Sequence, residues 1–441
     1  MDEINSVPKE GQPVSIDPKE VHGGRFFGRG KMYWKRLGPG IITGAADDDP
    51  SGIATYSQAG AGFGFQMLWL SVYTFPLMAV VQEMCSRIAL ATGRGLAANM
   101  RLFLPKYVLY GTALMLFAAN TFNIGADLGA MAEALTLIFP GIPSFLYLIV
   151  IAGVCLCFEI FANYASIAKY LKWLTFALLA YIVTGLIIKF SLPDLLRFSL
   201  VPHISFTKDF FFMITAVLGT TISPYLFFWQ TSQEVEEENE KKNRNEKVDS
   251  VENLKMIRYD VWFGMFFSNL VMFFIIAVCG DTLFKAGITS IATAGEAAEA
   301  LRPISGNLAS LIFTLGIVGT GFLAIPVLAG SSAYALSESF GWKEGLYKKF
   351  RQAKLFYLTI IASVVLGLIQ NFFHIGAMKT LVYSALLNGL IAPFILVSIV
   401  VLARKKEVMG QFVNSKGQSF VAILTTVIMF LVAGATIFTL L

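Results

Sequence analysis

Apolar runs of similar length recur along this sequence, and they restrict the folds open to it more than any other feature. A transmembrane helix needs about 20 apolar residues, and each run is close to that length. Backbone groups in lipid must be paired within the protein, so such runs cross a membrane as helices. The sequence predicts eleven spans, at residues 38–63, 66–92, 107–138, 143–162, 169–190, 209–232, 256–280, 306–337, 354–372, 377–403 and 418–440. We therefore expect an all-α integral membrane protein.

The composition and the loop charges agree with this assignment. Of 441 residues, 56% are hydrophobic and 14% are charged. When the N-terminus is placed inside, most loop Lys and Arg fall in inner loops, as the positive-inside rule requires. We predict a multi-pass cell-membrane protein that acts as a monomer in the bilayer, with a cytoplasmic arm at residues 1–36 and its C-terminus outside. The net charge of +5 belongs mostly to these inner loops, so it does not indicate nucleic-acid binding, and no cofactor is implied.

The first span carries a cluster of carboxylates at its centre. The stretch reads Gly44-Ala45-Ala46-Asp47-Asp48-Asp49-Pro50-Ser51-Gly52. Three central Asp residues cost on the order of 8–10 kcal/mol against lipid, so they must face protein or water, and a cation is their natural counter-charge. Pro50 removes a backbone donor and clashes with the carbonyl of Ala46, which predicts a break in the helix. Broken helices at mid-membrane line cavities, and in transporters they form the substrate site.

The sixth span contains a second interruption of the same kind. It reads Gly219-Thr220-Thr221-Ile222-Ser223-Pro224-Tyr225, with small and hydroxyl residues before a proline. Five spans separate the two prolines, and because five is odd the two halves have opposite orientation. Paired interruptions in inverted halves point to a transporter site, whereas Pro224 alone fits an ordinary kink equally well. We predict one half at 37–190, a second at 209–403 and an additional span at 418–441.

Three motifs resemble those of the natural resistance-associated macrophage protein (Nramp) family of metal transporters. Asp49-Pro50-Ser51-Gly52 resembles the family's Asp-Pro-Gly-Asn motif, and Ser223-Pro224-Tyr225 lies where the family has Met-Pro-His. Ala126-Asp127-Leu128 resembles its third-span aspartate motif. The chain looks closer to the Nramp-related magnesium transporter branch, whose first motif runs Asp-Asp-Asp-Pro-Ser-Gly. The resemblance implies the leucine-transporter (LeuT) type fold, with five plus five inverted spans, broken first and sixth helices, and one further helix.

The resemblance also implies a metal site whose ligands are all oxygen. Asp49 matches the metal-binding aspartate, and Gly52 replaces an Asn ligand, which opens space. Ser223 replaces a Met whose thioether favours softer transition metals, and Thr220 lies where the family offers a backbone carbonyl. Magnesium dehydrates reluctantly and keeps several waters when bound by one or two carboxylates. We therefore hypothesise alternating-access transport of largely hydrated Mg²⁺, with Mn²⁺ also carried.

Further polar residues in the spans are candidates for the same site or its pathway. Asp127 and Glu133 point about 120° apart on the third helix, and both are predicted to contact the metal from the wall of a wide cavity. The predicted pathway residues are Asp47, Asp48, Asn123, Tyr225, Ser384 and Asn388. For Asn120 and Asn123, hydrogen bonds to neighbouring helices are an alternative of equal weight.

Residues that would couple transport to protons are replaced here. Proton-coupled family members use a sixth-span His, a third-span Glu and basic ninth-span groups. The corresponding positions are Tyr225 and Ala130, and the ninth span, Leu355 to Leu368, holds no Arg or His. We predict uncoupled uptake, for which an inward-negative potential supplies about 4.6 kcal/mol per 100 mV for a divalent ion.

Other classes of protein remain as alternatives. The first is a proton-coupled Mn²⁺/Fe²⁺ importer of the main Nramp branch. The second is an amino-acid/sodium symporter of the same fold, but the Asp triplet would repel a substrate carboxylate. A channel or receptor fits paired broken helices poorly. An enzyme is not expected, because the sequence shows no nucleophile–base set and no cluster of metal-binding His.

Overall fold

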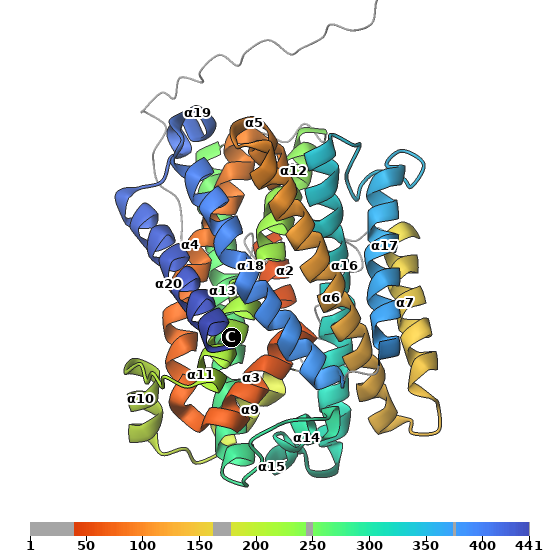
Figure 1. Ribbon diagram of the computed structural model, residues 1–441, viewed down its shortest axis with the longest axis vertical. Coiled ribbons are helices and arrows are strands. Elements are labelled where there is room, and N and C mark those ends of the chain that lie inside the picture. Colours follow the sequence, from red (N-terminus) through yellow and green to blue (C-terminus); the bar gives the residue numbers. More distant parts are fainter. Residues whose placement is uncertain (1–38, 162–177, 244–249, 374–375, 441) are drawn as a thin grey trace, which may run out of the picture. The chain divides into compact units, whose positions relative to one another are not determined.

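The computed structural model describes residues 39–161, 178–243, 250–373 and 376–440. Within these ranges every regular element is a helix (Figure 1). The predicted arm at 1–36 and most of the first half of the fifth span lie outside the described residues. Nine of the described segments are long and apolar enough to cross a membrane. Two of these segments, Pro50–Thr92 and Lys208–Glu240, each hold more than one helix, so the predicted count of eleven stays a prediction.

The elements follow one another with short connections. They are α2 (Pro39–Asp47), α3 (Pro50–Phe63), η1 (Gly64–Met67), α4 (Leu68–Thr92), α5 (Leu96–Phe103), α6 (Lys106–Ile138), α7 (Ser144–Phe161), α9 (Leu179–Ile187), α10 (Leu192–Leu200), α11 (Lys208–Thr221), α12 (Pro224–Asn243), α13 (Ser250–Cys279), η3 (Gly280–Phe284), α14 (Ala294–Glu299), α15 (Arg302–Ser305), η4 (Gly306–Leu308), α16 (Ala309–Phe340), α17 (Lys354–Gln370), η5 (Asn371–Phe373), α18 (Ala377–Arg404), α19 (Lys406–Met409), η6 (Gly410–Phe412) and α20 (Lys416–Leu440).

Both predicted helix breaks are confirmed. α2 ends at Asp47 and α3 begins at Pro50, while α11 ends at Thr221 and α12 begins at Pro224. A proline suits the first position of a helix, because the missing N–H has no intrahelical acceptor there. Asp49 caps α3 by accepting a hydrogen bond from the Gly52 N–H. The local sequence thus stops one helix and starts the next within two residues.

Proline alone does not explain these breaks. Pro76, Pro326 and Pro393 all lie inside continuous helices, α4, α16 and α18 respectively. At the first break the difference is the residue before the proline, because the Asp49 side chain can satisfy the exposed N–H groups of a new helix start. At the second break the helix also ends, at Thr221, and a new one begins at Pro224, so the alternative of an ordinary kink at Pro224 is wrong.

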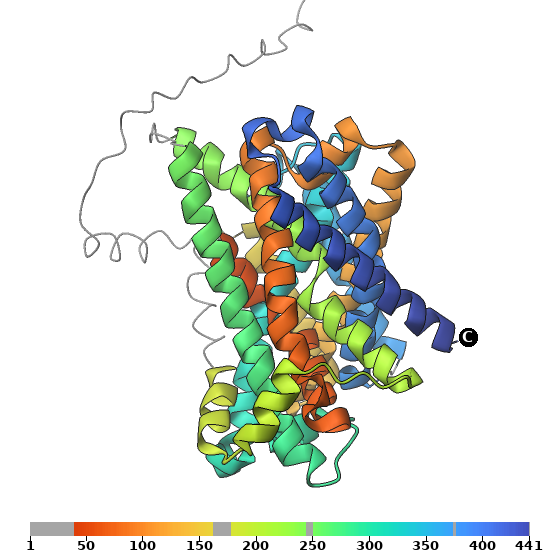
Figure 2. The ribbon, with the colours of Figure 1, turned by 90° about the vertical axis from the view of Figure 1, so that its left-hand side faces the viewer.

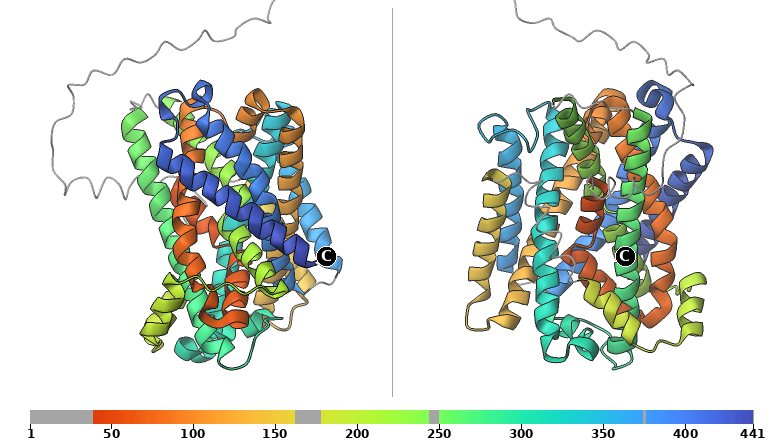
Figure 3. Two further views of the ribbon diagram at one scale, coloured as in Figure 1. Left: turned by 60° about the vertical axis from the view of Figure 1, so that its left-hand side comes forward. Right: turned by 180° about the vertical axis from the view of Figure 1, so that it is seen from behind.

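The core surrounds the broken helices. Among the largest fully buried side chains are Tyr56 on α3 and Tyr225 and Trp229 on α12. α11 approaches α18 closely because Gly219 and Gly389 face the partner backbone, where a Cβ atom would collide. Small residues at such contacts are typical of helix packing in membranes. Figures 2 and 3 show α4 beside α13, and the right view of Figure 3 shows the short α2 against α13.

The connections separate into two ends of the helical part. α5 and α19 lie at one end, and α10, α14 and α15 lie at the other (Figure 1). Arg101 of α5 and Lys406 of α19 belong to loops predicted to be inside, whereas Arg302 of α15 belongs to a loop predicted to be outside. The alternation of inner and outer loops is therefore present, and the assignment of the ends stays a prediction.

Candidate functional site

Asp49 lies at the first break with both carboxylate oxygens hydrogen-bonded. Oδ1 accepts from the Gly52 N–H and from the Ser51 hydroxyl, each at 2.7 Å. Oδ2 accepts from the Asn123 side-chain amide of α6 at 3.0 Å. The side chain is buried, and among the described residues no basic group forms an ion pair with it. A negative charge held only by neutral donors is a natural position for a cation.

Asn123 is oriented from its other side by α18. The Ser384 hydroxyl donates to Asn123 Oδ1 at 2.8 Å, so the amide nitrogen faces Asp49. The structure thus brings together two predicted pathway residues with the predicted metal ligand. Asn120, one turn earlier, instead donates to Leu328 O and to two serine hydroxyls of α16. The structural alternative therefore holds for Asn120, whereas Asn123 bonds directly to the site.

The two breaks meet at Gly52. A Cβ atom on Gly52 would lie 3.2 Å from both Asp47 O and Thr220 Oγ1, and 3.4 Å from Asp49 Oδ1. The Ser51 and Thr220 hydroxyls are 3.5 Å apart. Because Gly52 has no side chain, oxygen atoms from both broken helices approach one small region. This juxtaposition is expected of a site that two broken helices share.

Residues of the second break use part of their hydrogen-bonding capacity within the protein. The Ser223 hydroxyl donates to Thr220 O at 2.5 Å and also lies 3.2 Å from Gly219 O, so it caps the end of α11. Tyr225 donates its hydroxyl to Ala46 O at 2.9 Å and satisfies a carbonyl left free at the end of α2. The predicted ligand atoms Thr220 O and Ser223 Oγ therefore bond to each other in this structure.

Asp127 and Asn388 are buried beside this region without hydrogen bonds. Both carboxylate oxygens of Asp127 and both amide atoms of Asn388 lack a hydrogen-bond partner in the described part of the chain. Asp127 interacts electrostatically with Asp49, and Asn388 lies one turn from Ser384 on α18. A buried polar group left unpaired costs about 1–3 kcal/mol, so these four atoms are well suited to a polar substrate or its water.

Asp47 and Asp48 are held by a residue that sequence reasoning missed. The Ser268 hydroxyl of α13 lies 2.5 Å from Asp47 Oδ2 and 3.2 Å from Asp48 Oδ1. Both carboxylates are buried. The only signal in the sequence was a Ser-Asn pair, Ser268 and Asn269, inside an apolar run.

Glu133 does not join the other candidates. Its Oε1 accepts the N–H of Ala294 at 2.8 Å, at the start of α14, and its side chain is part-buried. It lies six residues beyond Asp127, or about 9 Å along α6. The prediction that Glu133 contacts the metal finds no support in this geometry. Its position instead fastens the connection between α13 and α16 to α6.

The chemistry of the gathered atoms is that of oxygen ligands. Carboxylate, hydroxyl and main-chain oxygens lie close to Gly52, and such ligands suit hard cations. Over the ranges the structure describes, no group of three or more His, Cys, Asp or Glu side chains is arranged to hold a metal ion.

Two helices broken at facing positions, with buried carboxylates between them, define an integral membrane protein of the transporter class. The chain belongs to the natural resistance-associated macrophage protein-like family, whose profile matches residues 40–439. It is 26% identical over 415 residues to the divalent metal cation transporter MntH of Yersinia enterocolitica, covering 90% of this chain and 92% of that protein. It is 25% identical to the MntH protein of Erwinia tasmaniensis, covering 88% and 90%.

Solved structures share the fold at low sequence identity. The manganese transporter of Eremococcus coleocola, in complex with an aromatic bis-isothiourea compound, has a TM-score of 0.77 at 17% identity, covering 94% of this chain and 88% of that chain. Mhp1, a nucleobase-cation-symport-1 family transporter in a closed conformation, has a TM-score of 0.51 at 15% identity, covering 91% and 92%. These similarities support the predicted fold class, while the five-plus-five repeat stays a prediction.

Proposed function

We propose that the protein transports divalent metal ions, Mg²⁺ in particular and Mn²⁺ as well, by alternating access through the Asp49 region. The observation that carries the proposal is the Asp49 carboxylate, fixed by neutral donors where the two broken helices meet. Asp127 is one turn of α6 from Asn123 and Asn388 one turn of α18 from Ser384, and the polar side-chain atoms of Asp127 and Asn388 are unpaired in the described part of the chain. The names of the relatives, divalent metal cation transporter and manganese transporter, agree with this substrate class.

The preference for Mg²⁺ rests on ligand chemistry. Ser223 supplies a hydroxyl at the break where a thioether would select softer metals. Gly52 leaves space, and a site with few carboxylates suits an ion that keeps several of its waters. Asp49, Thr220 and Asp127 are the proposed contacts, some of them through water. Asp47 and Asp48 add negative charge on the side of α2.

We propose further that transport is not coupled to protons. At the second break, Tyr225 stands where proton-coupled family members have a His, and its hydroxyl donates a hydrogen bond to Ala46 O. α17 contains neither Arg nor His. The membrane potential alone then drives a divalent cation inward, with the N-terminus in the cytoplasm, the C-terminus outside and one chain as the transport unit.

Uptake into proteoliposomes tests the proposed function. Mg²⁺ and Mn²⁺ flux is measured with internal indicators while a pH dye reports proton entry. We expect both ions to enter, Mg²⁺ to compete with Mn²⁺, and the internal pH to stay constant. Asp49→Ala should abolish both fluxes. Flux of Mn²⁺ alone with acidification would favour the proton-coupled Mn²⁺/Fe²⁺ importer, the alternative that the name manganese transporter supports.

A further inference from the structure

α13 holds α2 through contacts spaced one helical turn apart. The Gly40 N–H donates to Asp260 Oδ2 at 2.7 Å, and the Ser268 hydroxyl reaches Asp47 and Asp48. Between these contacts, a Cβ atom on Gly44 would lie only 2.5 Å from the carbonyl carbon and oxygen of Gly264. Gly40 and Gly44 of α2, and the Asp pair where the helix ends, therefore face positions 260, 264 and 268 of α13 in register.

This register has a physical basis in the sequence of α2. Gly40 and Gly44 form a small-xxx-small pair, which lets two membrane helices approach closely. Close backbone contact at Gly264 then places Ser268 one turn further along, level with the carboxylates. The position of the Asp cluster is thus set by the position of α13.

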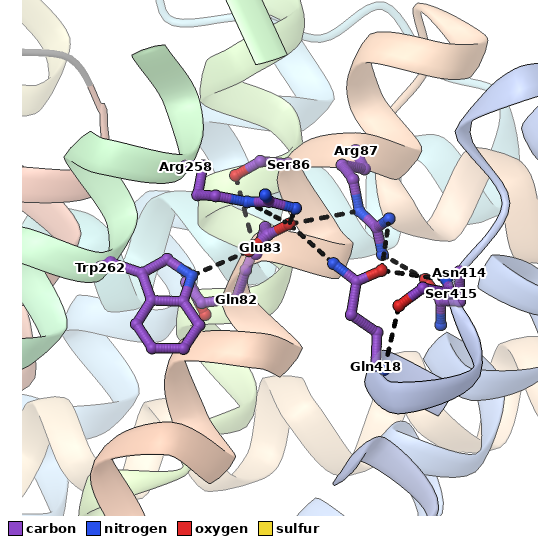
Figure 4. Close-up of polar contacts among 9 residues, drawn as sticks. All are labelled: Gln82, Glu83, Ser86, Arg87, Arg258, Trp262, Asn414, Ser415 and Gln418. Atoms are coloured by element: carbon purple, nitrogen blue, oxygen red, sulfur yellow. Dashed lines mark hydrogen bonds and ion pairs between the residues drawn. The ribbon is translucent and has the colours of Figure 1, made fainter. Parts of the chain in front are cut away.

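The opposite side of α13 is fastened to a buried carboxylate. Arg258 and Trp262 are one turn apart and lie about 200° around the helix from position 260. Arg258 donates to Glu83 Oε1 from Nε at 3.1 Å and from a terminal nitrogen at 2.8 Å, and Trp262 Nε1 donates to Glu83 Oε2 at 2.8 Å. Figure 4 shows both side chains reaching Glu83 of α4 from α13.

Glu83 also connects to α20 through the cluster drawn in Figure 4. Gln418 Nε2 donates to Glu83 Oε1 at 2.9 Å, and Arg87 donates to Gln418 Oε1 at 3.1 Å and to Asn414. Glu83 is buried, and Arg87 lies 3.9 Å from it as a second ion pair. Removing one partner of a buried pair is strongly destabilising, because the remaining charge is left uncompensated.

The same turn of α4 also contacts the second broken helix. Gln82 Nε2 donates to Leu226 O at 3.0 Å, two residues after Pro224. One turn of α4 is therefore bonded to α12 directly and to α2 through α13. The half-helices α2 and α12 are therefore both positioned by the same turn of α4.

We propose that Glu83 is a positioning residue for the ion site, acting through α13. By binding Arg258 and Trp262, Glu83 fixes the position of α13 along its axis and therefore the position of Ser268. Ser268 in turn holds the carboxylates at the end of α2. Loosening Glu83 releases α2 from its register although no atom of Glu83 touches the ion. The transport consequence rests on the proposed function, but the release of α2 does not.

Thiol labelling of α2 tests this directly. Ile42, which is partly buried on α2, is changed to Cys in a Cys157→Ser background, because Cys157 is exposed and the other three cysteines are buried. The labelling rate with a water-soluble maleimide is measured for the full chain in detergent. We expect Glu83→Gln to raise the rate at least fivefold, and Trp262→Phe, which removes one donor only, to raise it less.

Two further variants separate positioning from general stability. Glu338→Gln alters another buried carboxylate, which accepts hydrogen bonds from Ala98 N of α5 and Ser232 of α12, and it should leave the rate unchanged. Ser268→Ala should raise the rate, and the double variant with Glu83→Gln should add little, because both changes act on one path. In flux assays Glu83→Gln should change KM more than kcat.

The labelling result decides the proposal whatever the transported ion proves to be. Equal labelling of Ile42→Cys with and without Glu83→Gln would overturn it. If Glu83→Gln does not fold, the same comparison with Trp262→Phe decides in its place. Full additivity of Glu83→Gln and Ser268→Ala would also contradict the path through α13.

Discussion

The side-chain amide of Asn123 donates to Asp49 Oδ2 at 3.0 Å and thereby ties the first helix break to the third span. The same amide accepts from Ser384, so α18 sets its direction. The Asp49 carboxylate is consequently held in one orientation by residues from α3, α6 and, indirectly, α18. The Asp49 carboxylate is therefore preorganised rather than mobile.

Asn123→Ala should weaken the site without unfolding the protein. A hydrogen bond to a charged group contributes about 1.5–3 kcal/mol, so we expect the KM for Mg²⁺ to rise about tenfold or more. The matched control is Asn120→Ala, which removes the same side chain one turn away, where it bonds α16 instead. That control should lower thermal stability and leave the KM within about twofold. Equal effects of the two changes on KM would contradict the role given to Asn123.

Gly52→Ala should reduce transport because it fills the space between the two breaks. The added Cβ would lie 3.2 Å from Asp47 O and Thr220 Oγ1, which is tight enough to displace either atom or an ion's water. We expect a clear loss of Mg²⁺ flux at unchanged expression. Gly111→Ala is the control, since nothing lies within 4 Å of a Cβ there on α6. Undiminished flux of Gly52→Ala would show that the space at Gly52 is not used.

The variants Asp127→Asn and Glu133→Gln should have different effects on ion binding, although both change an acidic residue of α6. Asp127 is buried without a hydrogen bond, so removing its charge should weaken ion binding while thermal stability is kept or increased. Glu133→Gln keeps the oxygen that accepts the Ala294 N–H and should leave Mg²⁺ affinity unchanged. Titration calorimetry with Mg²⁺ on both variants checks this. A larger loss of affinity in Glu133→Gln would restore Glu133 as a ligand.

The free energy of unfolding should fall with rising pH because of Glu344, which lies in the connection between α16 and α17. Burial, together with the nearby Glu338 charge, raises the pKa of Glu344 to about 9. An acid whose pKa is raised on folding keeps its proton in the folded chain when the unfolded chain has lost it, so stability decreases between about pH 4.5 and 9. Glu344→Gln should flatten the fall in thermal midpoint over this interval. A steeper fall in that variant would contradict the assignment.

The breaks themselves were predictable from sequence because their causes are local. Pro50 with Asp49 before it, and Pro224 with Ser223 before it, carry both the stop and the start of a helix within a few residues. Asn123 and Ser384 were predicted as pathway residues from their polar character within apolar spans, and for Asn123 a bond to a neighbouring helix was an equal alternative. Their mutual hydrogen bond could not be predicted, since it depends on how α6 and α18 pack.

The parts that sequence reasoning missed depend on contacts between distant segments. Ser268 is one small polar residue in an apolar run, and nothing local shows that it faces Asp47 and Asp48. The ligand role of Glu133 stays a prediction, and its hydrogen bond to the Ala294 N–H, 161 residues away, could not be read from the sequence. The charged residues Glu83 and Arg87, one turn apart inside an apolar span, were a sequence signal for a buried ion pair.

The central claim is that Asp49 holds a largely hydrated divalent cation where the two broken helices meet. Anomalous diffraction from crystals soaked in Mn²⁺ tests it most directly. We predict a single strong peak among Asp49, Thr220 and Asp127, with water molecules supplying most of the contacts around the ion. A peak away from Asp49, or an ion bound directly by four or more protein atoms, would contradict the account.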